Sequence, residues 1–319
     1  MRATGLDPAT HTVSLDSGEA IRGDGVIIAT GASPRTLAGP ALAGVHTLRT
    51  MADCLALRDE LDEATRVAIV GSGFIGSEVA ATCRGRGLGV TVIEALPVPL
   101  LRALGTEMGG ICGQLHPDNG VDLRLGVGVE GLEGSEHVER VRLTDGSAVE
   151  AEVVVVGIGV APETGWLEGS GLTIDNGVVC DAWCQAAPGV VAAGDVARWH
   201  NPLFDTTMRL EHWSNAVEQA EAAARTLLRG TDGMAPFAPV PYFWSDQYTT
   251  KIQFLGHSAE GDDVAVVEGA PGDGRFVAAY GRNGRIVGAL LVNRAARLPL
   301  YKGLIAEQAA FPPPSDSPA

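Results

Sequence analysis

The 319-residue sequence predicts an α/β fold in which the strands of a parallel sheet alternate with helices. Two observations lead to this prediction. Short apolar runs that suit buried strands alternate with segments of helical spacing. One of these runs, Val153–Val156, contains no charged residue, which is typical of a strand covered on both faces. A chain of this length suits two or three domains.

The composition excludes several classes of protein. Apolar residues make up 45% of the sequence and charged residues 19%, which is enough to form well-buried cores. The formal net charge of -16 argues against binding to nucleic acid or to an anionic membrane. The opening segment has no apolar signal region and no apolar run is long enough to span a bilayer, so we expect a soluble, cytoplasmic protein.

The expected elements follow from apolar periodicity and from turn residues. In chain order they are a hairpin with its turn at 16–18, a strand at 25–31, a helix at 51–61, a strand at 66–70, a helix at 74–84, a strand at 90–94, a helix at 106–115, strands at 121–125, 139–143, 149–150, 153–157 and 189–194, and an alanine-rich helix at 215–229 that Gly230 closes. Three prolines in 234–241 predict a linker. Short strands from 242 to about 305 predict a final domain, and residues 312–319 are expected to be a disordered tail.

The sequence Gly71-Ser-Gly-Phe-Ile-Gly76 follows an expected strand and opens an expected helix. Glycines at this spacing permit a tight turn, close approach of a pyrophosphate and close packing of helix on strand, while the helix N-terminus attracts phosphate. Glu94 closes the next strand, where a carboxylate accepts hydrogen bonds from a ribose and repels a 2′-phosphate. We therefore predict a Rossmann-like site that favours NADH over NADPH. A solvated strand end is the alternative interpretation of Glu94.

Six motifs occur in the order that is typical of one family. They are Ala29-Thr-Gly-Ala-Ser-Pro-Arg35, the glycine motif at Gly71, Val156-Gly-Ile-Gly-Val-Ala-Pro162, Ala193-Gly-Asp-Val196, Leu210-Glu-His-Trp-Ser-Asn-Ala216 and Tyr242-Phe-Trp-Ser-Asp-Gln-Tyr248. Through them nearly the whole chain resembles the FAD-dependent ferredoxin and rubredoxin reductases of the pyridine nucleotide-disulfide oxidoreductase superfamily. This group includes putidaredoxin reductase and the reductase components of aromatic-ring dioxygenases.

The resemblance implies an NADH-dependent ferredoxin reductase, in which hydride passes from NADH to FAD and single electrons pass to a ferredoxin that feeds a monooxygenase or dioxygenase. It also implies Rossmann-like FAD and NAD domains, with the FAD domain incomplete, and a small α+β C-terminal domain. The expected parts are a remnant of the FAD domain at 1–36, the NAD(H) domain at 37–165, the return segment of the FAD domain at 166–240 and the C-terminal domain at 241–319.

The same resemblance and the glycine motif give a set of candidate cofactor-binding residues. They are Thr30, Gly31, Arg35, Gly71, Gly73, Phe74, Ile75, Gly76, Glu94, Gly157, Gly159, Asp195 and Trp213. By resemblance, Asp195 binds the ribityl chain of FAD, and a carboxylate suits a polyol. The alternative is that Gly194 and Asp195 form only a strand-to-helix turn.

Three further residues are candidates for the catalytic centre by resemblance: Glu78 near the nicotinamide, and Trp213 and Trp244 around the flavin ring. The alternatives are a Glu favoured by the helix dipole and ordinary core tryptophans. His212 is not expected to act as an acid or base, since hydride transfer requires orientation more than proton transfer.

The five cysteines do not form a Cys-x-x-Cys pair, so a dithiol relay is not expected, and Cys180 and Cys184 lack the further ligands that zinc or an iron–sulfur cluster requires. We expect all five to be reduced thiols. Two alternatives stay open: an NADH oxidase-like or peroxidase-like flavoenzyme, and an NAD-binding or interaction fragment without redox turnover.

One segment reverses the acidic character of the chain. Residues 275–302 contain six basic residues and no Asp or Glu: Arg275, Arg282, Arg285, Arg294, Arg297 and Lys302. Such a segment is suited to steering an acidic ferredoxin, and an ordinary solvated surface is the alternative. The protein is expected to be a monomer or a homodimer.

One part of the family pattern does not match. Family members begin with a strand, a glycine turn and a helix that bind the ADP half of FAD, and the residues before Ala29 do not supply that unit. We therefore expect a truncated FAD domain, an apolar strand at 26–30 with missing sheet neighbours, and weak or absent FAD binding.

Overall fold

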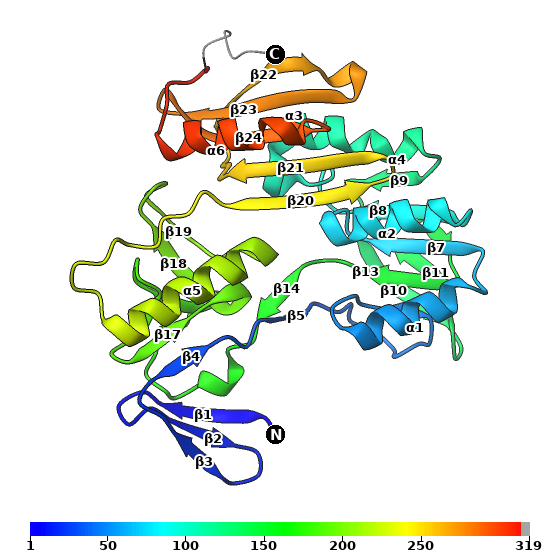
Figure 1. The fold of residues 1–319 in the computed structure, drawn as a ribbon. Coiled ribbons are helices and arrows are strands. Elements are labelled where there is room, and N and C mark those ends of the chain that lie inside the picture. The colour runs from blue at the N-terminus through cyan, green and yellow to red at the C-terminus, as the bar shows by residue number, and fades with distance from the viewer. Residues whose placement is uncertain (314–319) are drawn as a thin grey trace. The chain divides into compact units, whose positions relative to one another are not determined.

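The protein is described here by a computed structural model that covers residues 1–313 and divides into two compact units (Figure 1). The first unit contains Met1–Ser33, Ala161–Phe243 and Leu255–His257, and the second contains Pro34–Val160, Trp244–Phe254 and the chain from Ser258. Residues 314–319 of the expected tail lie outside the described residues. The boundaries of the four expected parts stay a prediction.

A five-stranded parallel sheet forms the centre of the second unit. Its strand order is β6-β13-β7-β8-β9, with bounds Val45–His46, Val153–Val156, Arg66–Val70, Gly89–Glu94 and Asp122–Leu125. The helices between these strands are α1 (Met51–Leu61), α2 (Phe74–Gly85), α3 (Leu101–Gly113) and α4 (Leu115–Asp118). The strand order reverses between β7 and β13, which is where ligands bind in open α/β sheets. The Rossmann-like fold expected from the sequence is confirmed.

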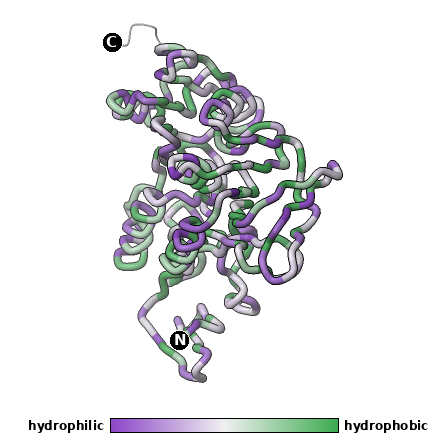
Figure 2. The backbone as a smooth tube through the Cα atoms, turned by 90° about the vertical axis from the view of Figure 1, so that its right-hand side faces the viewer, coloured by the Kyte–Doolittle hydropathy of each residue, from purple (hydrophilic) through white to green (hydrophobic). Residues whose placement is uncertain are grey.

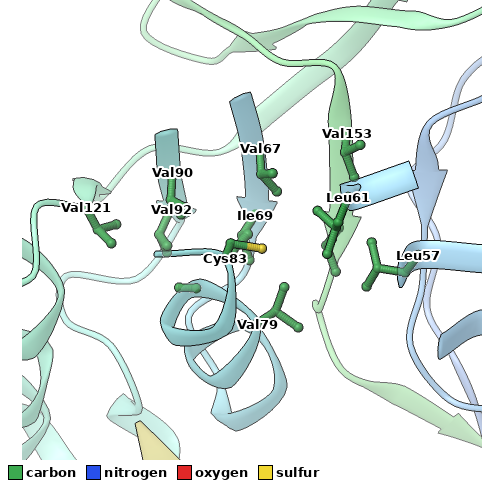
Figure 3. Close-up of a cluster of buried hydrophobic side chains, with 12 residues drawn as sticks. Leu57, Leu61, Val67, Ile69, Val79, Cys83, Val90, Val92, Val121 and Val153 are labelled. Carbon is green, nitrogen blue, oxygen red and sulfur yellow. The ribbon is translucent and has the colours of Figure 1, made fainter. Parts of the chain in front are cut away.

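Apolar side chains cover both faces of this sheet. Figure 3 shows the cluster on one face, with Leu57 and Leu61 of α1, Val79 and Cys83 of α2, and Val67, Ile69, Val90, Val92, Val121 and Val153 of the sheet and its connections. On the other face, Ala68 and Val154 pack against Val141 and Leu143. Strand β13 is therefore buried on both faces, as its uncharged sequence predicts. Each fully buried Val or Ile contributes ~1.5–3 kcal/mol to folding.

Helix α1 begins where its sequence predicts. The Thr50 hydroxyl accepts a hydrogen bond from the amide of Asp53, and the Asp53 carboxylate accepts one from the amide of Thr50. This capping box satisfies two of the amides that a helix N-terminus leaves without partners. Helix α3 begins earlier than expected, at Leu101, and Gly105 with φ 73° interrupts its helical geometry.

Two antiparallel systems complete the second unit. A three-stranded sheet, β10-β11-β12, has bounds Val129–Gly134, Val138–Leu143 and Ala148–Glu150. The C-terminal sheet has the order β20-β21-β24-β23-β22, with bounds Tyr242–Gln247, Thr250–Gly256, Arg285–Val292, Arg275–Arg282 and Asp263–Ala270. It is followed by α6 (Leu298–Ala306). This is the α+β domain that the sequence predicts.

The first unit contains three small sheets and one long helix. The sheets are β1-β2-β3 (Ala3–Asp7, Thr12–Leu15, Ala20–Arg22), β16-β17-β4 (Gln185–Ala187, Val190–Ala192, Val26–Ile28) and β15-β18-β19 (Val178–Cys180, Ala197–Asn201, Thr206–Met208), and the helix is α5 (Trp213–Arg229). Strands β5 (Ala32–Pro34) and β14 (Val160–Pro162), which each span a boundary between the two units in sequence, form a further pair. Short 3-10 turns occupy 165–167 and 194–196 in the first unit and 271–273 and 295–297 in the second. Strand β4 is shorter than expected. Among the described residues its sheet neighbour is β17, and Ile27 is 44% exposed.

The proline-rich segment 234–241 has no regular element, but it is held in place more firmly than a linker requires. The Trp183 indole donates a hydrogen bond to the carbonyl oxygen of Met234 at 2.9 Å, and the Asn201 amide donates to that of Pro239 at 3.0 Å. Phe237 packs against the indole of Trp199. The segment therefore lacks regular secondary structure, as its prolines predict, and aromatic and amide side chains of the first unit bind backbone groups that lie outside any ladder.

Colouring by hydropathy shows short apolar stretches separated by hydrophilic ones along the chain (Figure 2). In residues 1–313, no helix is long and apolar enough to cross a membrane. The expected location in the cytoplasm stays a prediction.

Candidate functional site

The turn between β7 and α2 has the close contacts that its glycines predict. Gly71 has φ +97°, and a Cβ built there would lie 2.4 Å from the carbonyl oxygen of Gly157. A Cβ on Gly76 would lie 2.0 Å from the carbonyl oxygen of Gly71. A side chain at either position would displace backbone, so strand, turn and helix are packed as closely as a dinucleotide site requires.

The N-terminus of α2 is suited to bind phosphate. Gly73 is the N-cap residue, no side chain caps the helix, and a Cβ on Gly73 would have nothing within 4 Å. Phe74 and Ile75 begin the helix, and Ile75 is exposed. The positive end of the helix dipole therefore lies beside open space, which fits the pyrophosphate of a dinucleotide.

Glu94, at the end of β8, is fixed against this turn. Its carboxylate accepts hydrogen bonds from the amide and the hydroxyl of Ser72, both at 2.8 Å, and from the amide of Leu96 at 2.9 Å. A carboxylate has about four acceptor positions, so capacity for a ribose hydroxyl remains. The alternative that Glu94 is a merely solvated strand end does not account for these three bonds.

The end of β13 meets the glycine turn at the reversal of strand order. The amide of Gly157 donates to the carbonyl oxygen of Val70 at 2.7 Å. Gly159 has φ +96°, and its carbonyl oxygen accepts a hydrogen bond from the amide of Arg35 at 2.9 Å. The guanidinium of Arg35 donates to the carbonyl oxygen of Val160 at 3.3 Å. The structure therefore brings Gly71, Gly157 and Gly159 together with Arg35.

In the first unit, Thr30, Gly31 and Asp195 follow two parallel neighbouring strands, β4 and β17. The Thr30 hydroxyl donates to the carbonyl oxygen of Glu163 at 2.8 Å, and the carbonyl oxygen of Gly31 accepts from the amide of Glu163 at 2.9 Å. Gly194, with φ +77°, opens the short turn that contains Asp195. Because carboxyl ends of parallel strands meet at one sheet edge, these candidate FAD ligands share that edge.

Polar side chains from α5 and its approach support the turn at Asp195. The Gln219 side-chain oxygen accepts hydrogen bonds from the amide of Gly194 at 2.9 Å and from the Asn215 side-chain amide at 3.3 Å. The Arg209 guanidinium donates to the carbonyl oxygen of Asp195 at 2.9 Å. The turn is therefore built into a polar network, which exceeds what a simple strand-to-helix connection needs.

Several atoms of this network fit a polar cofactor. Nδ1 of His212, Oδ1 of Asn215 and Nε2 of Gln219 are buried without a hydrogen-bond partner among the described residues. Buried polar atoms are normally satisfied, so these atoms fit a ligand with donors and acceptors such as FAD. Burial lowers the pKa of His212 to about 4, so its imidazole is neutral at pH 7 and is not a proton donor of ordinary strength.

Glu78 lies in the second turn of α2 and is bound to the C-terminal sheet. The Ser245 hydroxyl donates to its carboxylate at 2.6 Å, and the Gln247 amide donates to the Ser245 oxygen at 3.2 Å. Ser245 and Gln247 are fully buried in β20. Trp244, next to Ser245, is 41% exposed, and Trp213, at the start of α5, is 73% exposed. Neither tryptophan is a core residue, so packing alone does not explain them.

All five cysteines are free thiols, as expected, and four of them are buried. Burial raises the pKa of Cys180 and of Cys184 to about 12, so both remain protonated at neutral pH. A protonated, buried thiol is a poor nucleophile and a poor redox group. The described residues contain no group of three or more His, Cys, Asp or Glu arranged to hold a metal ion.

Sequence reasoning missed the polar residues that support these sites: Ser72, Ser77, His116, Arg209, Asn215, Gln219, Ser245, Gln247 and Tyr248. One signal was present, because Asn215 and Gln219 are four residues apart and so share one face of an otherwise alanine-rich helix. Two amides on the buried face of a helix predict a hydrogen-bond network.

A glycine turn for a dinucleotide, a carboxylate that closes the next strand and a second polar strand edge define a pyridine-nucleotide-dependent flavoprotein. Residues 1–220 match the family described as pyridine nucleotide-disulphide oxidoreductase, and residues 242–316 match the family described as reductase C-terminal. The chain belongs to the pyridine nucleotide-disulphide oxidoreductase family. The resemblance read from six motifs is confirmed, and with it FAD and NAD(H) as the cofactors of the family.

Relatives and solved structures agree with this membership. The chain is 38% identical to the ferredoxin–NAD(+) reductase component of the anthranilate 1,2-dioxygenase system of Burkholderia cepacia, over 98% of this chain and 77% of that protein. It is similar to a ferredoxin reductase from Rhodopseudomonas palustris (TM-score 0.88, 33% identity, 98% of this chain and 79% of that one). It is also similar to the reductase in a covalent putidaredoxin reductase–putidaredoxin complex (TM-score 0.88, 32% identity, 96% and 75%).

Proposed function

We propose that this chain is an NADH-dependent ferredoxin reductase that serves a monooxygenase or dioxygenase system. The observation that carries the proposal is the presence, in one chain, of a dinucleotide turn and a reductase C-terminal domain, with relatives that are ferredoxin–NAD(+) reductase components. When bound, FAD accepts two electrons as hydride and returns them singly. Cys180 and Cys184, the two thiols nearest each other in sequence, are buried and protonated, so this pair does not offer a competing path.

NADH binds along the carboxyl edge of the parallel sheet. Gly71, Gly73 and the first amides of α2, at Phe74 and Ile75, hold the pyrophosphate, and Gly76 allows the close packing that this requires. Glu94 binds the ribose diol and excludes a 2′-phosphate by charge repulsion. Gly157 and Gly159 leave room for the coenzyme at the end of β13.

The strand edge of the first unit holds FAD, with Thr30, Gly31 and Asp195 as ligands, and Trp213 of the same unit is assigned to the flavin ring. In the second unit, Arg35 is assigned as a cation for phosphate, Glu78 to the nicotinamide and Trp244 to the flavin ring. Hydride transfer needs alignment, and none of these side chains has to move a proton. The bond from Ser245 fixes the Glu78 carboxylate in one orientation.

The test is a stepwise reconstitution. The full chain is supplied with FAD, and the flavin absorbance is followed during anaerobic addition of NADH. Bleaching by NADH, followed by reduction of an added ferredoxin or of cytochrome c through ferredoxin, is the expected result. Oxygen consumption that does not depend on ferredoxin would favour an NADH oxidase. NADH binding without bleaching would favour a binding protein and contradict the proposal.

For the docking of ferredoxin, the structure separates the six basic residues of 275–302 into two groups. Arg282 forms an ion pair with Asp262, Arg297 forms one with Glu268, and Arg285 donates to the side chain of Gln308. Arg275, Arg294 and Lys302 form no ion pair within residues 1–313. Arg275 and Arg294 line a cavity of about 270 Å³. We assign the attraction of an acidic partner to these three cations, of which Arg294 also interacts electrostatically with Glu268.

Exchanging charge at this cavity is expected to weaken ferredoxin reduction selectively. The double variant Arg275→Glu/Arg294→Glu should lower kcat/KM for ferredoxin about tenfold at low ionic strength, because close like charges replace attractive ones. The effect should shrink as salt is added. Reduction of ferricyanide by NADH should be unchanged. The control, Arg58→Glu on the exposed face of α1, should leave both rates unchanged. Equal losses with ferredoxin in both variants would argue against this docking surface.

A further inference from the structure

A chain of hydrogen bonds, part-buried at its first bond and buried at the other two, connects the C-terminal sheet to the dinucleotide turn, entirely inside the second unit. The hydroxyl of Tyr248 lies 2.8 Å from Nδ1 of His116, and Nε2 of His116 lies 3.2 Å from the hydroxyl of Ser77. The Ser77 hydroxyl donates to the carbonyl oxygen of Ser72 at 3.4 Å. Tyr248 and His116 are 132 residues apart in sequence, and α4 and the β20–β21 connection bring them together.

The tautomer of His116 sets the direction of these bonds. In the tautomer that satisfies all three, Ser77 donates to the carbonyl oxygen of Ser72 and accepts from Nε2 of His116, and Nδ1 accepts from Tyr248. The same carbonyl oxygen also accepts from the amide of Leu100 at 3.2 Å. Burial lowers the pKa of His116 to about 4 and raises the pKa of Tyr248 to about 12, so both are neutral at pH 7. The amide of the same Ser72 peptide segment donates to Glu94. The chain therefore ends at the residue that binds the ribose.

Tyr248, which contacts His116, has a strained backbone conformation. Tyr248 has φ +56° in the two-residue connection between β20 and β21, a position that favours glycine. Such a conformation costs ~1–3 kcal/mol in a residue with a side chain and persists where surrounding contacts over-determine it. The Tyr248 side chain packs against the core cluster of the parallel sheet, and its ring meets the His116 ring edge-on at 5.8 Å. A glycine there would relieve the strain but leave His116 without its donor.

We propose that Tyr248 is a positioning residue for the coenzyme: through His116 and Ser77 it holds the Ser72 segment of the glycine turn, and so Glu94, in the conformation that binds NADH. The inference rests on the proposed function, since it assigns a task to the C-terminal domain in coenzyme binding. Tyr248 acts on the coenzyme indirectly, through hydrogen bonds that lead to the backbone of Ser72 in the glycine turn.

The test compares two tyrosines that each form one part-buried hydrogen bond to a side chain. Tyr248→Phe removes the bond to His116, and Tyr301→Phe removes the donor to the Glu268 carboxylate at 2.9 Å, in the same unit. NAD+ is titrated into each full chain supplied with FAD, and heat is measured. The Kd for NAD+ should rise about threefold to tenfold in Tyr248→Phe and less than about twofold in Tyr301→Phe.

A double-substitution cycle shows whether the effect travels along the chain. Ser77→Ala breaks the same chain at its other end and keeps a good helix former in α2. If Tyr248 acts through Ser77, the double variant should bind NAD+ about as weakly as each single variant. The inference would be overturned if the increases in Kd from Tyr248→Phe and Ser77→Ala multiplied in the double variant. It would also be overturned if the two tyrosine variants had equal Kd values. Either result would leave the proposed function intact. Absence of NAD+ binding by the unaltered chain would refute the proposed function and this inference with it.

Discussion

Substitution of Gly71 by alanine is expected to weaken NADH binding by about a hundredfold or more, because ~3 kcal/mol of strain at the turn is equivalent to a factor of that size. Two physical effects combine at this position. The backbone has φ +97°, which residues with a side chain rarely adopt, and the added Cβ would lie 2.4 Å from the carbonyl oxygen of Gly157. The turn must open to relieve that overlap, and the amides of α2 then lose their alignment. Calorimetric titration with NAD+ measures the loss.

Gly87→Ala provides the matched control. Gly87 follows the other end of α2, has φ +83°, and a Cβ there would meet nothing within 4 Å. It therefore imposes a similar backbone penalty without the overlap, and thermal unfolding should show a modest loss of stability with unchanged NAD+ affinity. If Gly71→Ala bound NAD+ as tightly as Gly87→Ala, the glycine turn would not be the coenzyme site.

The parallel sheet and its helices could be predicted because their signals are local. Helix α1 has its capping box and its bounds in adjacent residues, and the strand, glycine turn and helix around Gly71 lie within 20 residues of sequence. Helix α3 was harder. Its glycines lower helix propensity, and one of them makes a close contact with the segment that precedes the helix: a Cβ on Gly109 would lie 2.5 Å from the carbonyl oxygen of Pro99. Packing therefore outweighs helix propensity in α3, and the start of this helix expected from the sequence was five residues too late.

The residues proposed to bind the coenzyme could be predicted from the sequence. The residues that hold those side chains in place could not. The glycines and Glu94 are proposed to bind the coenzyme directly, and a spacing that follows from the shape of a dinucleotide can be found in the sequence. The supports come from far along the chain: Ser245 is 167 residues from Glu78. A serine or a tyrosine in a strand has no local signal for such a partner. Two buried amides on α5 were an exception, since their helical spacing placed them on one face.

Substitution of Glu94 by glutamine is expected to lower kcat/KM for NADH about tenfold to a hundredfold, since hydrogen bonds to a charged group contribute ~1.5–3 kcal/mol. Glutamine has nearly the same shape, so the change removes the negative charge and one acceptor while keeping the volume. The carboxylate also binds the amides of Ser72 and Leu96, and an amide group satisfies only one of them. Loss of the charge removes repulsion of a 2′-phosphate, so the preference for NADH over NADPH should fall. Steady-state rates with both coenzymes test this.

Glu152→Gln is the control for Glu94→Gln, because it removes the charge of another carboxylate that accepts hydrogen bonds from backbone amides. Glu152 accepts hydrogen bonds from the amides of Thr65 at 2.6 Å and Arg66 at 3.2 Å, at the opposite end of β7 from the glycine turn. The amide of Thr65 above all holds the pKa of Glu152 below its ordinary value of 4.5, so its stabilisation is present above pH 4.5 and is lost as the pH falls further. Glu152→Gln should therefore lower stability to unfolding at pH 7, with a smaller difference in acid, and leave the coenzyme preference unchanged. Retention of strict NADH preference by Glu94→Gln would mean that another residue selects the coenzyme.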